Sequence, residues 1–426
     1  MVKPEAKPRA KAKARAKAKA KAKAKLTLWR RLALFLVALW GAIALWQAPV
    51  VTLVATDEIR GVWMTNLGAS MMYYTLRTDE VVANLAKHGL NTLYPCVWNR
   101  GYTLHPSQIA KAAGGVLRDV TTDLPLVPGD DVLAGFVHQA HRQHLRIVPW
   151  FEYGLMIPET AAIALAHPDW LTTNRFGETV QNPLTPNPLP PEPIRNFQRE
   201  IIGGNLAWLN PFHPEVQQFL TDLIVEVVAR YPVDGIQLDD HFGLPVAFGY
   251  DPYTEELYKA EHDGAAPPTD ENNAEWVAWR ANRITQLLEK ITLAVKQANP
   301  KAIVSVSPNP PNFAYGKYLQ DWVRWVELGL VDEVVVQIYR ESLATLENDL
   351  YNSGFYSLRE QVPIAIGLYT GPFLQSKPIE QLDKEIQAVQ AAGYRGVAFF
   401  CWETTLWIFK GGSAQTVWQT LSERFS

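Results

Sequence analysis

Two adjacent carboxylates, Asp239 and Asp240, end a short apolar run within residues 233–242. An apolar run of this length favours a buried strand, which we predict over residues 235–239, with both acids at its C-terminal end. In a barrel of parallel strands the active site is built at the C-terminal ends of the strands. If the chain folds as such a barrel, the two acids therefore lie where catalytic residues are found.

Paired carboxyl groups carry out glycoside hydrolysis: one protonates the leaving oxygen, and the other acts as a nucleophile or as a base for water. Alternate residues of a strand share a face. If Gln237 and Asp239 face the barrel axis, Asp239 is the nucleophile or base, and Asp240 orients a partner or binds a hydroxyl group. The opposite register exchanges these roles, and acids that only cap the next loop have no catalytic role.

Three glutamates are candidates for the proton donor. Glu152 follows two aromatic residues at the end of the third predicted strand, next to the fourth, and apolar neighbours raise the pKa of a carboxyl as a general acid requires. Glu403, beside Trp402 at the end of the eighth strand, ranks second, and Glu341 ranks third. The sequence leaves this choice open, together with the stereochemical outcome.

Many other positions near predicted strand ends carry aromatic, amide or hydroxyl side chains. Aromatic faces cover the C–H faces of sugars, and polar groups bind sugar hydroxyls, so we predict a carbohydrate-binding rim. Any one of its tryptophans could instead pack between barrel and helices. The predicted substrate-binding residues are Trp63, Asn66, Trp98, Trp150, Tyr153, His241, Ser307, Asn309, Gln337, Tyr339, Tyr369 and Trp402.

Strand-like apolar runs alternate with segments of helical period along the chain after residue 58. Alternation of this kind predicts a parallel sheet covered by helices, and eight repeats favour a closed (β/α)8 TIM barrel. The predicted strands are 59–65, 91–98, 146–151, 235–239, 302–307, 333–338, 364–368 and 396–402. The predicted helices are 79–88, 132–143, 214–230, 274–298, 318–327, 343–351, 379–391 and 414–425.

Two long insertions follow the third and fourth predicted strands, at residues 153–210 and 241–273. Loops in these positions form the walls of a barrel's catalytic mouth. Prolines concentrate in residues 182–193, where they oppose regular structure, so this segment forms either a lid or cleft wall or a disordered excursion. One barrel of about 250 residues, enlarged by these insertions, accounts for residues 57–426 as a single domain.

Residues 1–31 form a basic block rich in Lys and Ala. Thirteen Lys and Arg against one Glu give it a charge of +12, and because the whole chain carries −3, the remainder carries −15. Such a block cannot bury a core, so we predict a disordered tail. Its position before an apolar segment favours contact with anionic lipid headgroups over binding to nucleic acid.

Residues 32–55 are almost uncharged and long enough to cross a bilayer. Arg30 and Arg31 are expected on the cytoplasmic side, which places the barrel on the periplasmic or extracellular side of a membrane. The long basic tail favours an uncleaved signal anchor over a signal peptide cut near Ala55.

The two cysteines, Cys96 and Cys401, end strands that are not neighbours in the barrel, so we predict buried thiols.

Seven ordered segments of the chain after about residue 57 resemble the glycosyl hydrolase-like 10 family: 60–65, 89–92, 209–216, 233–242, 305–308, 331–339 and 396–400. The resemblance implies a TIM-barrel hydrolase of envelope or extracellular type, and some relatives cleave peptidoglycan glycan strands stripped of peptides. This chain has Glu152 and Tyr153 where relatives often have Asn-Pro.

Three functions follow from these observations. The first is a membrane-anchored glycoside hydrolase that acts on a cell-envelope polysaccharide, with peptidoglycan glycan strands as the expected substrate and no cofactor. The second is a catalytically silent barrel that binds carbohydrate with the same residues. The third is a metal-dependent hydrolase that uses Asp239, Asp240 and His241; we expect no metal, because three consecutive strand residues cannot all point at one ion.

Overall fold

The computed structural model describes residues 7–45, 47–53, 55–75, 77–119, 122, 131–180, 205–372, 375–407 and 409–425. The chain divides into two compact units, Met1–Pro49 and Val50–Ser426. The second unit begins a few residues before the predicted start at residue 57, and it contains the predicted strands.

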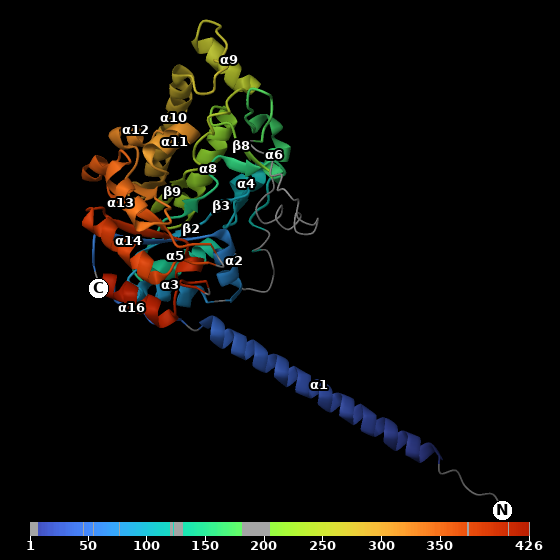
Figure 1. Cartoon of the computed structure of the whole chain (residues 1–426). Coiled ribbons are helices and arrows are strands. Elements are labelled where there is room, and N and C mark those ends of the chain that lie inside the picture. Colours follow the sequence, from blue (N-terminus) through green and yellow to red (C-terminus); the bar gives the residue numbers. More distant parts are fainter. Residues whose placement is uncertain are drawn as a thin grey trace, which may run out of the picture. The chain divides into compact units, whose positions relative to one another are not determined.

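The first unit holds the helix α1 (Lys7–Leu45) (Figure 1). Residues 7–31 are therefore helical where the sequence predicted disorder; Ala and Lys both have high helix propensity, which here outweighs repulsion between the lysines. The helix takes in the start of the predicted span 32–55 but ends at Leu45, and residues 47–53 are not helical. Of the helices in the described residues, none has the length and apolar character that crossing a membrane requires.

Nine strands form one parallel sheet in the order β5-β2-β1-β13-β12-β11-β10-β9-β6. The two strands that end this order, β5 and β6, are consecutive parts of one predicted strand, separated by Val148 and Pro149. The parallel sheet is therefore curled, as expected for a barrel-type α/β fold, and its two terminal strands belong to one chain segment. The strands are β1 (Ile59–Met64), β2 (Thr92–Pro95), β5 (Arg146–Ile147), β6 (Trp150–Phe151), β9 (Gly235–Asp239), β10 (Ile303–Ser307), β11 (Glu333–Gln337), β12 (Ile364–Tyr369) and β13 (Gly396–Phe400).

Each predicted helix has a counterpart among the helices that surround the sheet (Figure 1). Several begin at residues that satisfy the free N–H groups of a first turn: Ser342 accepts a hydrogen bond from the Thr345 N–H, and Asn273 accepts one from the Trp276 N–H. The helices are α3 (Thr78–Lys87), α5 (Val132–Arg142), α8 (Pro214–Arg230), α10 (Ala274–Ala298), α12 (Trp322–Glu327), α13 (Leu343–Asn352), α14 (Ile379–Ala391) and α16 (Ala414–Phe425).

Shorter elements occupy the connections between strands and helices. The first long insertion contains β7 (Met156–Pro158), α6 (Ala162–Ala166), η2 (Pro168–Trp170) and β8 (Leu206–Trp208), whereas the proline-rich segment 182–193 lies outside the described residues. The second insertion contains α9 (Pro252–Glu261). Elsewhere the connections contain α2 (Asn66–Thr75), β3 (Trp98–Asn99), β4 (Tyr102–Thr103), α4 (Gln108–Ala112), α11 (Pro311–Tyr318), η3 (Tyr356–Glu360) and α15 (Trp402–Thr405).

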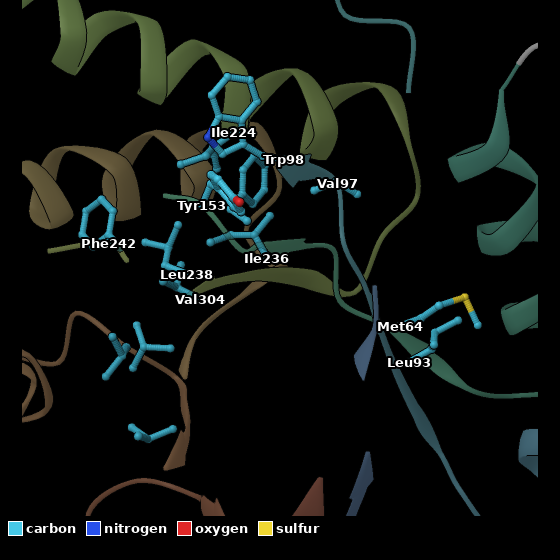
Figure 2. Close-up of a cluster of buried hydrophobic side chains, with 14 of the residues drawn as sticks. Met64, Leu93, Val97, Trp98, Tyr153, Ile224, Ile236, Leu238, Phe242 and Val304 are labelled. Carbon is cyan, nitrogen blue, oxygen red and sulfur yellow. The ribbon is translucent and has the colours of Figure 1, made fainter. Parts of the chain in front are cut away.

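Apolar side chains form two separate cores. The larger core lies between the sheet and its helices, where Trp98 and Tyr153 lie beside Ile224 and Ile236 (Figure 2). The smaller core belongs to the inner face of the curled sheet and includes Trp63, Tyr94, Trp150 and Ala398. Because these inner side chains fill the space enclosed by the strands, we expect a ligand to bind at the strand ends and not inside the sheet.

Candidate active site

Of the two orientations considered for β9, the structure has the one in which Gln237 and Asp239 face the inside of the curled sheet. Gln237, two residues earlier, accepts a hydrogen bond from the Trp63 indole N–H at 2.6 Å and donates one to the Ser305 hydroxyl at 3.0 Å. Both partners come from other strands of the sheet, so Gln237 lies on its inner face, and alternation places Asp239 on the same face. Asp239 is the last residue of its strand and is buried.

Neighbouring strands supply the hydrogen-bond donors that hold the Asp239 carboxyl. Ser307, which ends β10, donates its hydroxyl proton to Asp239 Oδ1 at 2.8 Å, and Gln337, which ends β11, donates from Nε2 to the same oxygen at 2.6 Å. Burial and then the nearby Asp240 carboxylate raise the pKa of Asp239 to about 7. Asp239 therefore changes its charge near neutral pH.

Asp240 and His241 lie just beyond the strand end and form an ion pair. His241 Nδ1 lies 3.2 Å from Asp240 Oδ1 and 3.6 Å from Asp239 Oδ2, and 3.1 Å from the backbone oxygen of Glu152. Burial lowers the pKa of His241, but Asp240 and Asp239 together raise it to about 10. Asn309 donates from Nδ2 to the other Asp240 oxygen at 2.7 Å. A positive imidazolium thus lies beside two carboxyl groups.

The geometric argument against a metal site was wrong. One ligand atom from each of Asp239, Asp240 and His241 lies within 4.8 Å of the other two. The strand ends at Asp239, and the Phe242 N–H donates to the Asp239 oxygen across a tight turn, so strict alternation no longer applies to the next residues. Two carboxylates and an imidazole suit a divalent cation chemically.

Glu152 supplies a third carboxyl from the residue after β6. Its Oε2 accepts a hydrogen bond from Asn99 Nδ2 at 2.6 Å and from the Cys96 thiol at 3.2 Å. Burial raises the pKa of Glu152, and these donors partly offset that rise. The pKa is thus raised by burial, but the groups that contact the carboxyl oxygen are an amide and a thiol instead of the predicted apolar neighbours. Asn99 and Cys96 were not predicted as its partners, because their contact depends on the pairing between distant strands.

The alternative acid Glu403 is buried away from solvent. The strand β13 ends at Phe400, earlier than predicted, and the short helix α15 places Glu403 against the start of α2. Its Oε1 accepts hydrogen bonds from the hydroxyl and backbone N–H of Thr65, and none of its surface is exposed. We therefore interpret Glu403 as a residue that fixes the turn between β1 and α2. Glu341, the third candidate, is exposed.

Three partly exposed aromatic rings stand near the carboxyl groups. The Tyr339 and Phe400 rings are stacked, with centroids 5.6 Å apart, and the Tyr369 ring lies 5.5 Å from Tyr339. Burial, and next the carboxylate of Asp239, raise the pKa of Tyr339 well above its usual value. Tyr339 and Tyr369 were predicted to bind substrate, whereas Phe400 was assigned to the interior of a strand.

The predicted tryptophan contacts are buried instead. Trp63 and Trp150 fill the interior of the sheet, and Trp98 packs against Phe219 of α8 on its outer side. Trp402 is also buried and stacks on Trp407 at 5.1 Å. Large apolar rings gain most when fully removed from water, which favours the core over the rim. Tyr153 is largely buried, and Asn66 is half-buried as the first residue of α2.

Both cysteines are free buried thiols, as predicted. The site thus combines Asp239, Asp240, His241 and Glu152 with polar partners from β10, β11 and their following loops. Ser307, Asn309 and Gln337, predicted to bind substrate, hold the acids directly. They were recognised because polar residues at the ends of apolar strands stand out in the sequence.

Solved structures with the same architecture are glycoside hydrolases by title. The chain is similar to the glycoside hydrolase domain of PgaB (BpsB) from Bordetella bronchiseptica, with a TM-score of 0.59 and 12% identity over 85% of this chain and 99% of that one. It is also similar to alpha-L-fucosidase isoenzyme 2 from Paenibacillus thiaminolyticus, with a TM-score of 0.54 and 13% identity over 89% of this chain and 48% of that one. At these identities the likeness shows a shared fold.

Two named relatives are similar in sequence. Glycosyl hydrolase DigH of Escherichia coli (strain K12) is 25% identical over 335 residues, which cover 69% of this chain and 68% of the relative. Glycosyl hydrolase YngK of Bacillus subtilis (strain 168) is 22% identical over 315 residues, or 66% of this chain and 54% of that protein.

A family profile covers most of the second unit. It includes the residues of the site except Phe400, at the end of β13. The profile is described as glycosyl hydrolase-like 10, and it matches residues 58–388. This range contains Glu152, Asp239, Asp240 and His241. The chain therefore belongs to the glycosyl hydrolase-like 10 family.

Proposed function

We propose that the protein is a glycoside hydrolase that cleaves O-glycosidic bonds in a polysaccharide of the cell envelope. The observation that carries the proposal is the Asp239 carboxyl, buried at a strand end, held by Ser307 and Gln337, and ionising near pH 7. A second carboxyl with a raised pKa, Glu152, belongs to the same site. Family membership and the names of the relatives support a glycosidase.

In the proposed reaction Glu152 gives its proton to the leaving oxygen as the glycosidic C–O bond breaks. Ionised Asp239 attacks the anomeric carbon or takes a proton from the attacking water. Hydrogen bonds from Ser307 and Gln337 fix the orientation of the Asp239 carboxyl. The positive charge of His241 favours the ionised form of Asp239, and Asp240 in turn holds His241 in place.

Peptidoglycan glycan strands are the substrate that we propose. The partly exposed rings of Tyr339, Tyr369 and Phe400 offer apolar faces to sugar rings, and Asn309 and His241 offer polar contacts. The sequence similarity to glycosyl hydrolases DigH and YngK supports a glycan as the ligand class.

Replacing Asp239 by Asn tests the function directly. Asp239→Asn keeps the shape of the side chain but removes its charge, so we expect hydrolysis to fall by roughly 10³-fold or more. Binding of the glycan should be retained. The measurement is release of reducing ends from peptide-free glycan strands, with affinity measured on the same material.

The matched control is Glu380→Gln, an exposed carboxyl in the first turn of α14, which should retain wild-type activity. Unchanged hydrolysis by Asp239→Asn would reject the role of Asp239. A wild-type protein that binds glycan strands but never cleaves them would instead identify a silent carbohydrate-binding barrel.

Metal-dependent hydrolysis is the second candidate, favoured by the convergence of Asp239, Asp240 and His241. In the structure His241 Nδ1 already pairs with both carboxylates, which argues for an imidazolium in place of a metal ligand. We therefore expect that prolonged treatment with a chelator leaves hydrolysis unchanged. Loss of activity in the chelator, with recovery on adding a divalent cation, would favour the metal enzyme.

A further inference from the structure

A pocket of about 430 Å³ opens beside the carboxyl groups, within the volume range typical of small-molecule sites. It is bounded by the loop after β10, the first turn of α11, the residue after Tyr339, and the end of α13. The lining residues are Asn309, Pro310, Asn312, Phe313, Arg340, Asn352 and Ser353.

Asn309 connects this pocket with the reactive acids. Its side-chain N–H donates to Asp240 Oδ2 at 2.7 Å, while the residue also forms part of the pocket wall. A ligand in the pocket therefore lies next to the site where we propose that a glycosidic bond is cleaved. A chain of linked sugars bound at the proposed cleavage site must therefore extend into this pocket or pass close to it.

The chemistry of the lining suits a sugar ring. Asn309, Asn312 and Asn352 offer amide donors and acceptors for hydroxyl groups. Phe313 is 48% exposed, so part of its ring is open to a ligand in the pocket. An exposed aromatic face among amides can cover the C–H face of a pyranose.

Arg340 brings a guanidinium to the pocket wall, where it forms an ion pair with Asp349. Asp349 accepts a hydrogen bond from its Nε at 2.6 Å, and the Tyr339 oxygen accepts one from Nη1 at 3.2 Å. Lys377 also donates to the Arg340 backbone oxygen at 3.1 Å, so both the loop and the guanidinium are held in place. No hydrogen bond joins the Nη2 group of the guanidinium to the described residues, so this group can bind a ligand.

We propose that this pocket binds a sugar that carries a carboxylate, next to the sugar whose bond is cleaved, and that Arg340 binds the carboxylate. The proposal rests on the proposed hydrolase function and assigns to Arg340 the recognition of an acidic glycan, the class to which the proposed substrate belongs. Peptidoglycan strands without peptides fit this class, because every second sugar carries a lactyl ether with a free carboxyl group. A guanidinium held in a fixed orientation forms charge-assisted hydrogen bonds with such a group.

The test compares two ligands that differ in one functional group, a carboxylate or a primary alcohol. One is a peptide-free oligosaccharide of peptidoglycan, and the other is the same oligosaccharide after chemical reduction of its carboxyl groups to alcohols. Binding is measured with the Asp239→Asn variant, so that no cleavage occurs. We expect this protein to bind the carboxylate form about tenfold more tightly, and Arg340→Gln in the same background to abolish that preference.

Matched variants separate charge recognition from folding. Arg324→Gln removes an exposed arginine on α12 that pairs with Glu327, and it should keep the preference. Phe313→Ala should weaken binding of both ligands equally, because the ring contacts the sugar itself. A double variant, Arg340→Gln with Asp349→Asn, avoids an unpaired carboxylate and should behave as Arg340→Gln alone.

Two results would contradict the proposed binding of the carboxylate by Arg340. One is equal affinity of the protein with Arg340 for the two ligands, and the other is equal weakening of both by Arg340→Gln. Because binding is measured without turnover, this outcome is distinct from failure of the hydrolase proposal. If the protein with intact Asp239 fails to cleave the glycan but the charge preference depends on Arg340, the subsite stands and the catalytic assignment falls.

Discussion

At the scale of single residues, the site sets the charge of Asp239 through two neighbours that act in opposite directions. Burial and Asp240 raise its pKa, whereas His241 lowers it, and the result is a pKa of about 7. Because a buried carboxylate is disfavoured in the folded state, Asp239 contributes most to stability below the pKa of an unfolded aspartate, about 4. That contribution is lost as the pH rises through about 7.

The two neighbours give opposite predictions for the pH dependence of hydrolysis. If ionised Asp239 is required, kcat/KM should rise with pH through about 7. Asp240→Asn removes a repulsive charge and should move this rise to lower pH, while His241→Gln removes an attractive charge and should move it to higher pH. The measurement is the pH profile of kcat/KM for the three proteins. Shifts in the same direction for both variants would contradict the assignment.

At the scale of elements, the short helices at the strand ends decide which acids reach the site. The helix α15 begins two residues after β13 and directs Glu403 to Thr65, at the junction of β1 and α2. Gly68 of α2 leaves space for that carboxyl: a Cβ on Gly68 would lie 2.2 Å from Glu403 Oε1. The packing of α2 against α15 thus depends on one glycine and one buried acid.

We therefore expect Gly68→Ala to destabilise the protein by about 1–3 kcal/mol, although alanine usually favours a helix. The matched control is Gly316→Ala in α11, where nothing lies within 4 Å of the added methyl group. That change should stabilise the protein by about 0.4–1 kcal/mol. Chemical denaturation measures both values. Equal effects of the two substitutions would show that Glu403 moves freely to make room.

At the scale of the whole molecule, a buried polar network joins strands from opposite parts of the curled sheet. Glu333 of β11 accepts hydrogen bonds from Tyr94 of β2 at 2.9 Å and from Ser305 of β10 at 3.0 Å. Arg146 of β5 pairs with the other oxygen of Glu333 at 2.8 Å. These contacts lie toward the N-terminal ends of β5 and β11. The opposite, C-terminal strand ends carry Asp239, Ser307 and Gln337.

The division at Pro49 and Val50 leads to a prediction about the N-terminal unit. We propose that its basic and apolar residues attach the protein to a membrane, with the barrel on the periplasmic or extracellular side. The full chain should then be recovered with membranes and need detergent for release, while residues 50–426 should be soluble and equally active. Fractionation, with mass spectrometry of the N-terminus, checks this. Full-length chain in the soluble fraction with an intact N-terminus would contradict attachment.

The sequence by itself determined the order of strands and helices and the position of the acids at the end of β9. Local patterns carry this information, because apolar runs of strand length and helical periodicity depend only on near neighbours in the chain. The helices α8, α10, α14 and α16 have the predicted boundaries for this reason.

Only the tertiary structure decided which of the polar and aromatic residues belong to the site. The burial of Trp63, Trp98, Trp150 and Glu403 depends on strands and helices that are distant in sequence, as do the donors around Glu152. Asp239, Asp240 and His241 lie close together because β9 ends at Asp239 and the chain then turns. Contacts of this kind arise only when distant strands pair and helices pack on the sheet, so no local pattern in the chain encodes them.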